Sequence, residues 1–209
     1  SALDSLASIG WSYDDGSALD TFVNATLTTG LFSVLLGGGL VAVARSGAGK
    51  MASESNASLT ALLFSVLTAA ALLLPTILGL LADLSAENES LLQDLFMHSL
   101  RAFIIIAVMI NVLLTVAQRK GETIQASNWF VFMALASFIF GSQFRFFGEL
   151  TDVTQVVWLG ERMTQSWVMI SLIFAVAYHL VPRAASRPIW SDSMTKASML
   201  LLFITLPPF

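Results

Sequence analysis

Apolar segments long enough to cross a membrane fill most of this sequence and restrict it to few folds. Six of them can be delimited, at residues 22–44, 59–82, 95–117, 129–147, 156–181 and 193–209. A membrane-spanning helix needs about 20 apolar residues, and only the last segment is slightly shorter. The sequence is 56% hydrophobic and 11% charged, whereas about a quarter of the residues of a soluble domain are charged. We therefore predict an all-α integral membrane bundle of about six transmembrane helices.

The charged residues between these segments alternate in sign along the chain. Basic residues lie after the first, third and fifth segments: Arg45, Lys50, Arg119, Lys120, Arg183, Arg187 and Lys196. Acidic residues lie before the first segment and after the second and fourth: Asp4, Asp14, Asp15, Asp20, Asp83, Glu87, Glu89, Asp94, Glu149 and Asp152. Because basic loops stay in the cytoplasm, we predict that residues 1–21 form an extracytoplasmic segment and residues 22–209 the transmembrane domain. The expected location is a prokaryotic cytoplasmic membrane, with lipid and other membrane subunits as partners.

The composition excludes several kinds of site. The chain has no cysteine, which rules out disulfides, thiolate metal sites and iron–sulfur clusters. It has no basic patch with interleaved aromatic residues, so nucleic acid is not an expected partner. No lysine lies centrally in an apolar segment, so none is placed to carry a retinal Schiff base. Gly37, Gly38 and Gly39 lack the strand and the GK[ST] sequence of a phosphate loop, and we interpret them as a site of close helix packing.

Four charged residues in the fourth and fifth segments are candidates for a proton path or a buried charge. Glu161 and Arg162 project about 100° apart on a helix, so they do not form a facing pair. One interpretation is a proton-relay carboxylate, or a charge paired with a neighbouring helix. The other is a pair at the outer interface that extends to water near Glu149 and Asp152. Arg145 and Glu149 are spaced i,i+4, which is typical of an ion pair at a helix end.

The histidines and the phenylalanines give two further sets of candidates. His98 and Arg101 are candidates for a heme contact, and His179 is expected at the cytoplasmic interface. Two histidines at opposite membrane faces cannot ligate one heme or one copper ion, so we predict no metal site and no catalytic residue. Five phenylalanines line either a ligand pocket or, as is more common, the packing and lipid-facing surfaces: Phe138, Phe140, Phe144, Phe146 and Phe147.

A motif around Pro182 resembles one known family. The fifth segment ends in Tyr178, His179, Leu180, Val181, Pro182 and Arg183, and a short loop with RPIWS at 187–191 and SDSM at 191–194 follows. This arrangement resembles subunit I of the heme–copper oxygen reductases, in particular the B- and C-type branches. The resemblance implies that the six segments correspond to the second to seventh core helices of that subunit.

The metal ligands of that family have no counterpart here. Where the low-spin heme ligand is expected stand Asp20 and Thr21, and where a copper-ligating histidine follows a glycine, Gly160 is followed by Glu161. A match to the nitric oxide reductase branch would instead pair Glu161 with a glutamate of that branch. The resemblance thus implies a divergent or non-catalytic membrane subunit of a respiratory electron-transfer complex. Any enzyme it belongs to would be a terminal-oxidase-type oxidoreductase, with heme supplied only through a partner chain.

Two alternatives to this assignment stay open. One is a six-helix membrane transporter or ion channel whose pathway uses Glu161, Arg162 and Arg145, since charged groups inside membrane helices often mark such pathways. The other is a truncated piece of an oxidase catalytic subunit, which sequence with a histidine pair beyond Phe209 would support.

Overall fold

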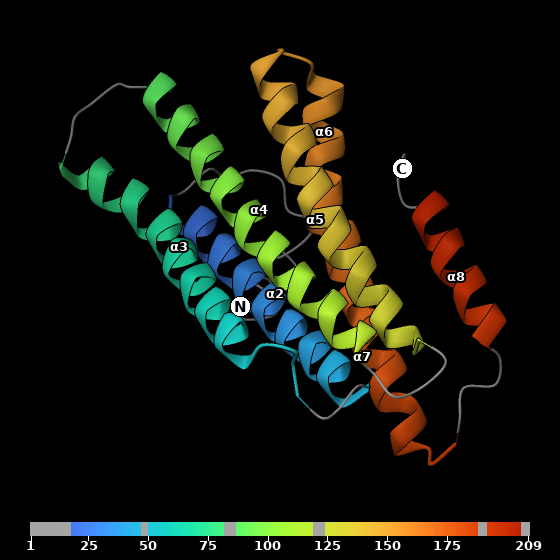
Figure 1. Cartoon of the computed structure of the whole chain (residues 1–209). Helices are drawn as coiled ribbons and strands as arrows, with labels where there is room; N and C mark the ends of the chain where they lie inside the picture. The colour runs from blue at the N-terminus through green and yellow to red at the C-terminus, as the bar shows by residue number, and fades with distance from the viewer. Residues whose placement is uncertain (1–17, 47–49, 82–86, 119–123, 188–191, 206–209) are drawn as a thin grey trace, which may run out of the picture.

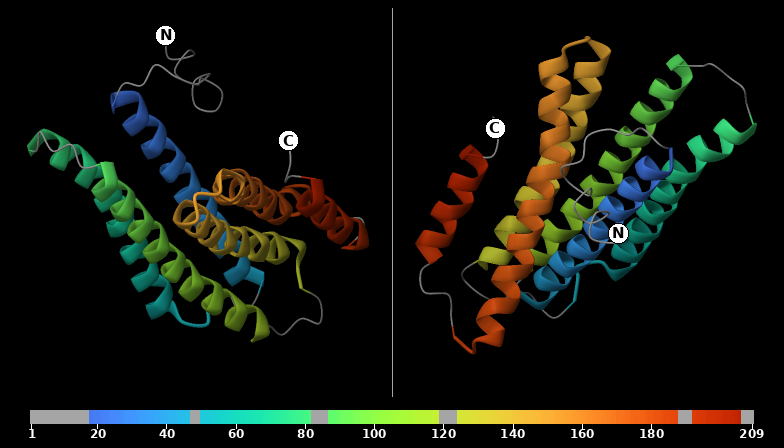
Figure 2. Two further views of the ribbon diagram at one scale, coloured as in Figure 1. Left: turned by 90° about the horizontal axis from the view of Figure 1, so that it is seen from above. Right: turned by 180° about the vertical axis from the view of Figure 1, so that it is seen from behind.

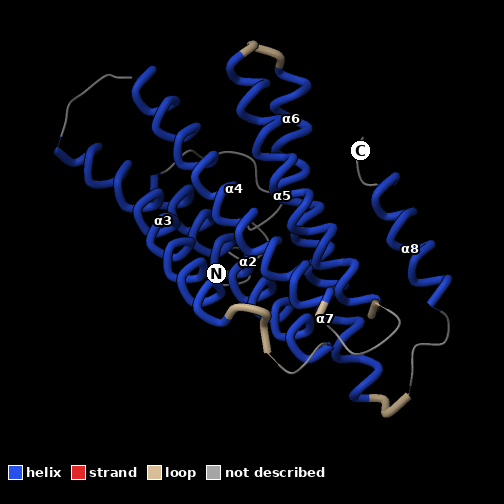
Figure 3. Tube along the Cα trace, in the orientation of Figure 1, coloured by secondary structure: helices blue, strands red, loops and turns tan. Residues whose placement is uncertain are grey.

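The chain folds into a bundle of helices, shown in Figure 1. The computed structural model describes residues 18–46, 50–81, 87–118, 124–187 and 192–205; the side chains near the start of the first helix, in the second half of the next and in the first half of the third are outside the description. The elements are α2 (Ala18–Ser46), α3 (Glu54–Leu81), α4 (Glu87–Ala117), α5 (Ala126–Leu150), α6 (Thr154–Arg162), η1 (Met163–Trp167), α7 (Val168–Ala184) and α8 (Asp192–Thr205). Within these ranges every element is helical, as Figure 3 shows.

The predicted all-α membrane bundle is confirmed. Among the described residues, four helical stretches are long and apolar enough to cross a membrane: Thr29–Ser46, Leu100–Ala117, Ala126–Leu150 and Thr154–Ala184. The last stretch is one continuous rod of 31 residues in which η1 joins α6 to α7. The chain is therefore an integral membrane protein in which each predicted segment corresponds to one helical rod.

The core lies where α2, α4, α5 and α7 meet. It contains Phe32, Leu36, Val43, Ile105, Val108, Val112, Phe130, Val131, Leu135, Val168, Leu172 and Ala175. On one side of this core α3 packs against α4 and α2, and on the other α8 stands at the edge, where its main contact is with α5 (Figure 2). Away from the core many large apolar side chains are exposed, as expected for helices that face lipid.

The glycine run in α2 is a packing site, which confirms the interpretation drawn from the sequence. A Cβ at Gly38 would lie 3.0 Å from Val176 Cγ2, and one at Gly39 would lie 3.1 Å from Val131 Cγ2. These two glycines let α2 approach α7 and α5 closely, as small residues do between membrane helices. Gly37 has open space around it and takes no part in the contact.

Three polar side chains tie the ends of α2, α3 and α4 together. Asn111 Oδ1 accepts a hydrogen bond from the Ser53 backbone N–H at 3.0 Å, and Asn111 Nδ2 donates to the Ser53 carbonyl at 2.8 Å. Thr115 Oγ1 accepts from the Ala52 N–H at 2.9 Å, and Asn128 Nδ2 donates to Ser46 Oγ at 2.8 Å. Asn111 and Asn128 are buried, so these bonds hold the α2–α3 loop and the start of α5 against the bundle.

The α5 and α7 helices end in the same way. After α5 the Val153 N–H donates to the Gly148 carbonyl at 2.9 Å, and Asp152 has φ 56°. After α7 the Arg187 N–H donates to the Pro182 carbonyl at 3.1 Å, and Ser186 has φ 51°. Both are Schellman ends, in which one residue in the left-handed region reverses the chain and satisfies the last carbonyls.

The expected end of the fifth segment at Pro182 is wrong by a few residues. The helix continues through Pro182 to Ala184, so Arg183 lies in its last turn rather than in the loop. A proline removes only one backbone N–H, the one that would bond the Tyr178 carbonyl. In the same turn Arg183 bonds the side chain of His179. Tyr178, from the same motif, stacks on Phe130 of α5 with ring centroids 5.2 Å apart.

Candidate functional site

The candidate site lies where α5 and α6 touch backbone to backbone. A Cβ at Gly160 would lie 2.5 Å from the Arg145 backbone nitrogen and 2.7 Å from the Gly141 carbonyl oxygen. Gly141 and Gly148 of α5 approach α6 equally closely, because a Cβ at Gly148 would lie 2.6 Å from the Val157 nitrogen. The three glycines therefore bring α5 and α6 so close that the charged residues beside them are gathered in one place.

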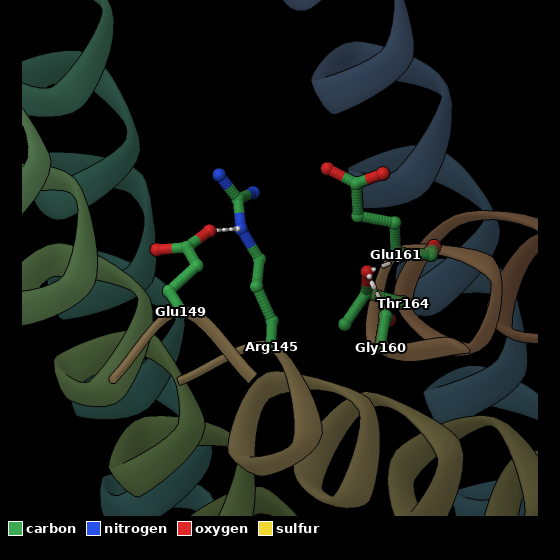
Figure 4. Close-up of polar contacts among 5 residues, drawn as sticks. All are labelled: Arg145, Glu149, Gly160, Glu161 and Thr164. Carbon is green, nitrogen blue, oxygen red and sulfur yellow. Dashed lines mark hydrogen bonds and ion pairs between the residues drawn. The ribbon is translucent and has the colours of Figure 1, made fainter. Parts of the chain in front are cut away.

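The predicted ion pair between Arg145 and Glu149 is present. Arg145 Nε donates to Glu149 Oε1 at 2.9 Å, and the two side chains are 21% and 15% exposed. The pair is thus more buried than the solvated helix-end contact that its spacing alone indicates. Figure 4 shows its position on α5 opposite Gly160 and Glu161 of α6.

Glu161 directly follows the glycine that contacts the Arg145 backbone. Its side chain is partly buried, and within the described part of the chain its carboxylate makes no hydrogen bond or ion pair. In Figure 4 the Glu161 and Arg145 side chains extend in the same direction from their two helices. A carboxylate without a partner, beside a partly buried ion pair on a membrane-spanning helix, is a candidate functional group.

Arg162 projects away from this group. Its guanidinium lies 5.5 Å from the ring centroid of Trp158, one turn earlier on the exposed side of α6. Glu161 and Arg162 therefore do not face each other, which confirms that part of the prediction. A guanidinium stacked on tryptophan is a stable cation–π pair, and Arg162 is not part of the Glu161 cluster.

The helix that carries Glu161 changes its hydrogen-bonding pattern immediately after the cluster. Residues Met163–Trp167 form a π-helical turn. Thr164 Oγ1 donates within this turn, at 3.0 Å to the Gly160 carbonyl and 3.1 Å to the Glu161 carbonyl. A π turn contains one more residue than an α turn, and such turns are frequent beside functional sites. The hydropathy and spacing of the fifth segment do not predict it.

His179 is buried among the helices near the end of α7, and its place at the cytoplasmic interface stays a prediction. Its side chain is 6% exposed, and its Nε2 lies 2.8 Å from Arg183 Nη1. Because arginine only donates, Nε2 is the acceptor and the imidazole is neutral with its proton on Nδ1. The bond occupies Nε2, so His179 does not fit the role of a heme ligand through that atom.

The two proposed heme contacts, His98 and Arg101, belong to α4. His98 belongs to the α4 backbone, but its side chain is outside the described residues. Arg101 is partly buried on α4. No group of three metal-ligating side chains occurs among the residues that the structure describes, and we derive no step through a metal or heme.

The five phenylalanines do not form one pocket. Phe138 is buried against Phe32 of α2, with centroids 5.7 Å apart, whereas Phe140 and Phe147 are 58% and 54% exposed. An open apolar groove of about 630 Å³ lies elsewhere, between α4, α5 and α8. Its lining includes Leu113, Trp129 and Met199. These phenylalanines thus serve packing and the lipid-facing surface.

Comparisons of this chain with protein-family models, with curated proteins and with solved structures find no match.

Proposed function

We propose that this chain is a non-catalytic membrane subunit of a respiratory electron-transfer complex in a prokaryotic cytoplasmic membrane. In this role Glu161 exchanges protons at the outer end of the bundle. The motif from Tyr178 to Met194 supports the class of complex, because it resembles a heme–copper oxidase subunit. The alternating loop charges support the orientation, with the basic loops in the cytoplasm and Glu161 toward the opposite face.

The observation that carries the proposal is the unpartnered carboxylate of Glu161. It stands beside the Arg145–Glu149 pair, whose salt bridge already uses the nearest carboxylate of α5. An ionisable side chain on a membrane-spanning helix that is not engaged in a structural ion pair is a candidate functional group by default.

A tagged form of the chain tests the class of complex. We expect the complex that it purifies to contain heme, and the chain stripped of its partners to show no heme absorption. A bis-histidine heme spectrum from the chain alone would contradict the proposal, because it would make this chain a cofactor carrier.

Replacement of Glu161 tests the proton role in the same complex, reconstituted in vesicles. We expect Glu161→Gln to slow proton release on the outer side during turnover, with assembly unchanged. The matched control is Glu54→Gln, because Glu54 is exposed at the start of α3. Equal proton release in the wild type and Glu161→Gln would refute the role.

The packing of the inner half argues against a transporter or channel within this chain. Among the described residues, the Arg145–Glu149 pair lies at the α5–α6 end, and α2 closes on α7 and α5 at Gly38 and Gly39. Side chains that pack this closely leave no water-filled path between these three helices. The subunit proposal therefore predicts no ion flux through vesicles that contain the chain alone.

A further inference from the structure

We infer that the π turn at Met163–Trp167 is a one-residue insertion that keeps the two halves of its helix in register, and so positions Glu161 beside Arg145. The geometric part of this inference stands alone. The importance of Glu161 rests on the proposed function.

The buried residues of α7 have defined rotational positions about the helix axis relative to Gly160. Five residues of α7 are buried: Val168, Ser171, Leu172, Ala175 and His179. The four other than Ser171 lie eight, twelve, fifteen and nineteen residues after Gly160. In an uninterrupted α-helix these spacings correspond to rotations of about 80°, 120°, 60° and 100° from Gly160. A regular helix of this sequence would therefore turn Gly160 about a quarter of a turn away from the face that these four residues share.

The extra residue of the π turn changes these rotational positions. Because a π turn absorbs one additional residue, the effective spacings fall to seven, eleven, fourteen and eighteen. The corresponding rotations are about −20°, 20°, −40° and 0°, which is a single helix face, with Ser171 at its edge at about −80°. Gly160 and these four residues of α7 thus face α5 and the core together only because the turn is present.

The α6 half of the helix cannot rotate to restore the register if the extra residue is absent. Gly160 meets the backbone of Arg145 and Gly141, so a neighbour with a Cβ could not take its place without separating the helices. Glu161 follows Gly160, and its direction is fixed by the same contact. Thr164 stabilises the turn by bonding the carbonyls of Gly160 and Glu161. Gly160 and Thr164 are therefore positioning residues for Glu161.

The test compares deletions of one residue at two places in the same helix. Deletion of Ser166 removes the inserted residue, so α6 and α7 should stay in register as a regular α-helix. We expect its thermal unfolding midpoint in detergent to lie within about 4 °C of the wild type. Deletion of Ile173, which is exposed, puts two of the four buried residues out of register whether or not the π turn persists. We expect it to lower the midpoint by more than about 10 °C. Equal damage from the two deletions would overturn the inference.

A chemical readout separates positioning of Glu161 from general stability. We would measure the labelling rate of Glu161 by a hydrophobic carbodiimide, with Glu161→Gln as the blank. Deletion of Ser166 should leave the rate unchanged, and insertion of one alanine after Ser166 should change it severalfold. If the insertion variant does not fold, Thr164→Val and Thr164→Ser replace it: valine should change the rate and serine should restore it. A rate that is the same in all folded variants would overturn the positioning role.

These outcomes differ from a failure of the proposed function. If Glu161→Gln leaves proton release unchanged while the two deletions behave as expected, the role of the π turn in the helix register is supported and only the proton role of Glu161 is refuted. If the two deletions behave alike while Glu161→Gln blocks proton release, the proton role of Glu161 is supported and the role of the π turn in the helix register is refuted.

Discussion

The two ends of the bundle are held together by different physical means. At the α5–α6 end, three glycines bring backbone against backbone, with no side chain between Gly160 and Arg145. At the opposite end, the amides of Asn111 and Asn128 bridge helices and a loop by hydrogen bonds. The glycine contact depends on shape, so an added side-chain atom would force the two helices apart. The amide bridges depend on hydrogen bonds, so each bond removed lowers the free energy of unfolding by its own contribution.

This difference also separates the functional from the structural part of the chain. The glycine contact brings the helix of the Arg145–Glu149 pair against the helix that carries Glu161, whose carboxylate has no partner among the described residues. The amide bridges instead satisfy the polar backbone groups of Ala52 and Ser53. We therefore expect a substitution at the glycine end to disrupt the packing of α5 and α6 as a whole. Substitutions at the amide end should lower stability in proportion to the hydrogen bonds that they remove.

The largest expected effect comes from Gly160→Leu. Its side chain would collide with the backbone of α5, which cannot move aside as a flexible side chain can. We expect a loss of about 3 kcal/mol or more in the free energy of unfolding, measured by tryptophan fluorescence on heating. The matched control is Gly37→Leu, because Gly37 has open space around it. A stable Gly160→Leu variant would show that the glycine contact is loose.

An intermediate effect is expected from Asn111→Leu at the other end. The substitution removes both bonds to Ser53 and leaves its N–H without an acceptor, which costs about 1–3 kcal/mol. The Ser53 carbonyl keeps its bond from the Ala57 N–H at 3.1 Å. Thr115→Val removes the acceptor of the Ala52 N–H and should cost less, because one bond rather than two is lost at the loop. Unfolding midpoints of the two variants in the opposite order would contradict a graded amide end.

The smallest expected effect is a gain from Asp152→Gly in the α5–α6 turn. Asp152 has φ 56°, a conformation that glycine adopts without strain, and we expect stabilisation by about 0.5 kcal/mol. Thr151→Gly is the control, because Thr151 has φ −101° and its hydroxyl bonds the Phe147 carbonyl at 2.7 Å. It should destabilise, and a shared direction of change in the two unfolding midpoints would contradict the assignment of the turn.

Much of the site was within reach of the sequence. The i,i+4 spacing of Arg145 and Glu149 predicts their ion pair, and the divergence of Glu161 from Arg162 follows from helix geometry. Asn111 and Asn128 also carry a signal, since a polar amide within or beside an apolar segment usually has a partner. The burial of His179 could not be predicted, because it depends on α2 closing against α7 at Gly38.

Hydropathy along the chain was enough to predict an all-α membrane protein and the positions of its helices. Hydropathy and helix length are local properties that add up along the chain, so they can be read without knowledge of neighbours. Three features could be seen only once the helices were packed together. The α5 and α6 helices meet at Gly160, a π turn joins α6 to α7, and Glu161 lies on α6 opposite the helix of the Arg145–Glu149 pair. These features depend on how two helices fit against each other, and a contact between backbones leaves no pattern in the sequence beyond a few glycines.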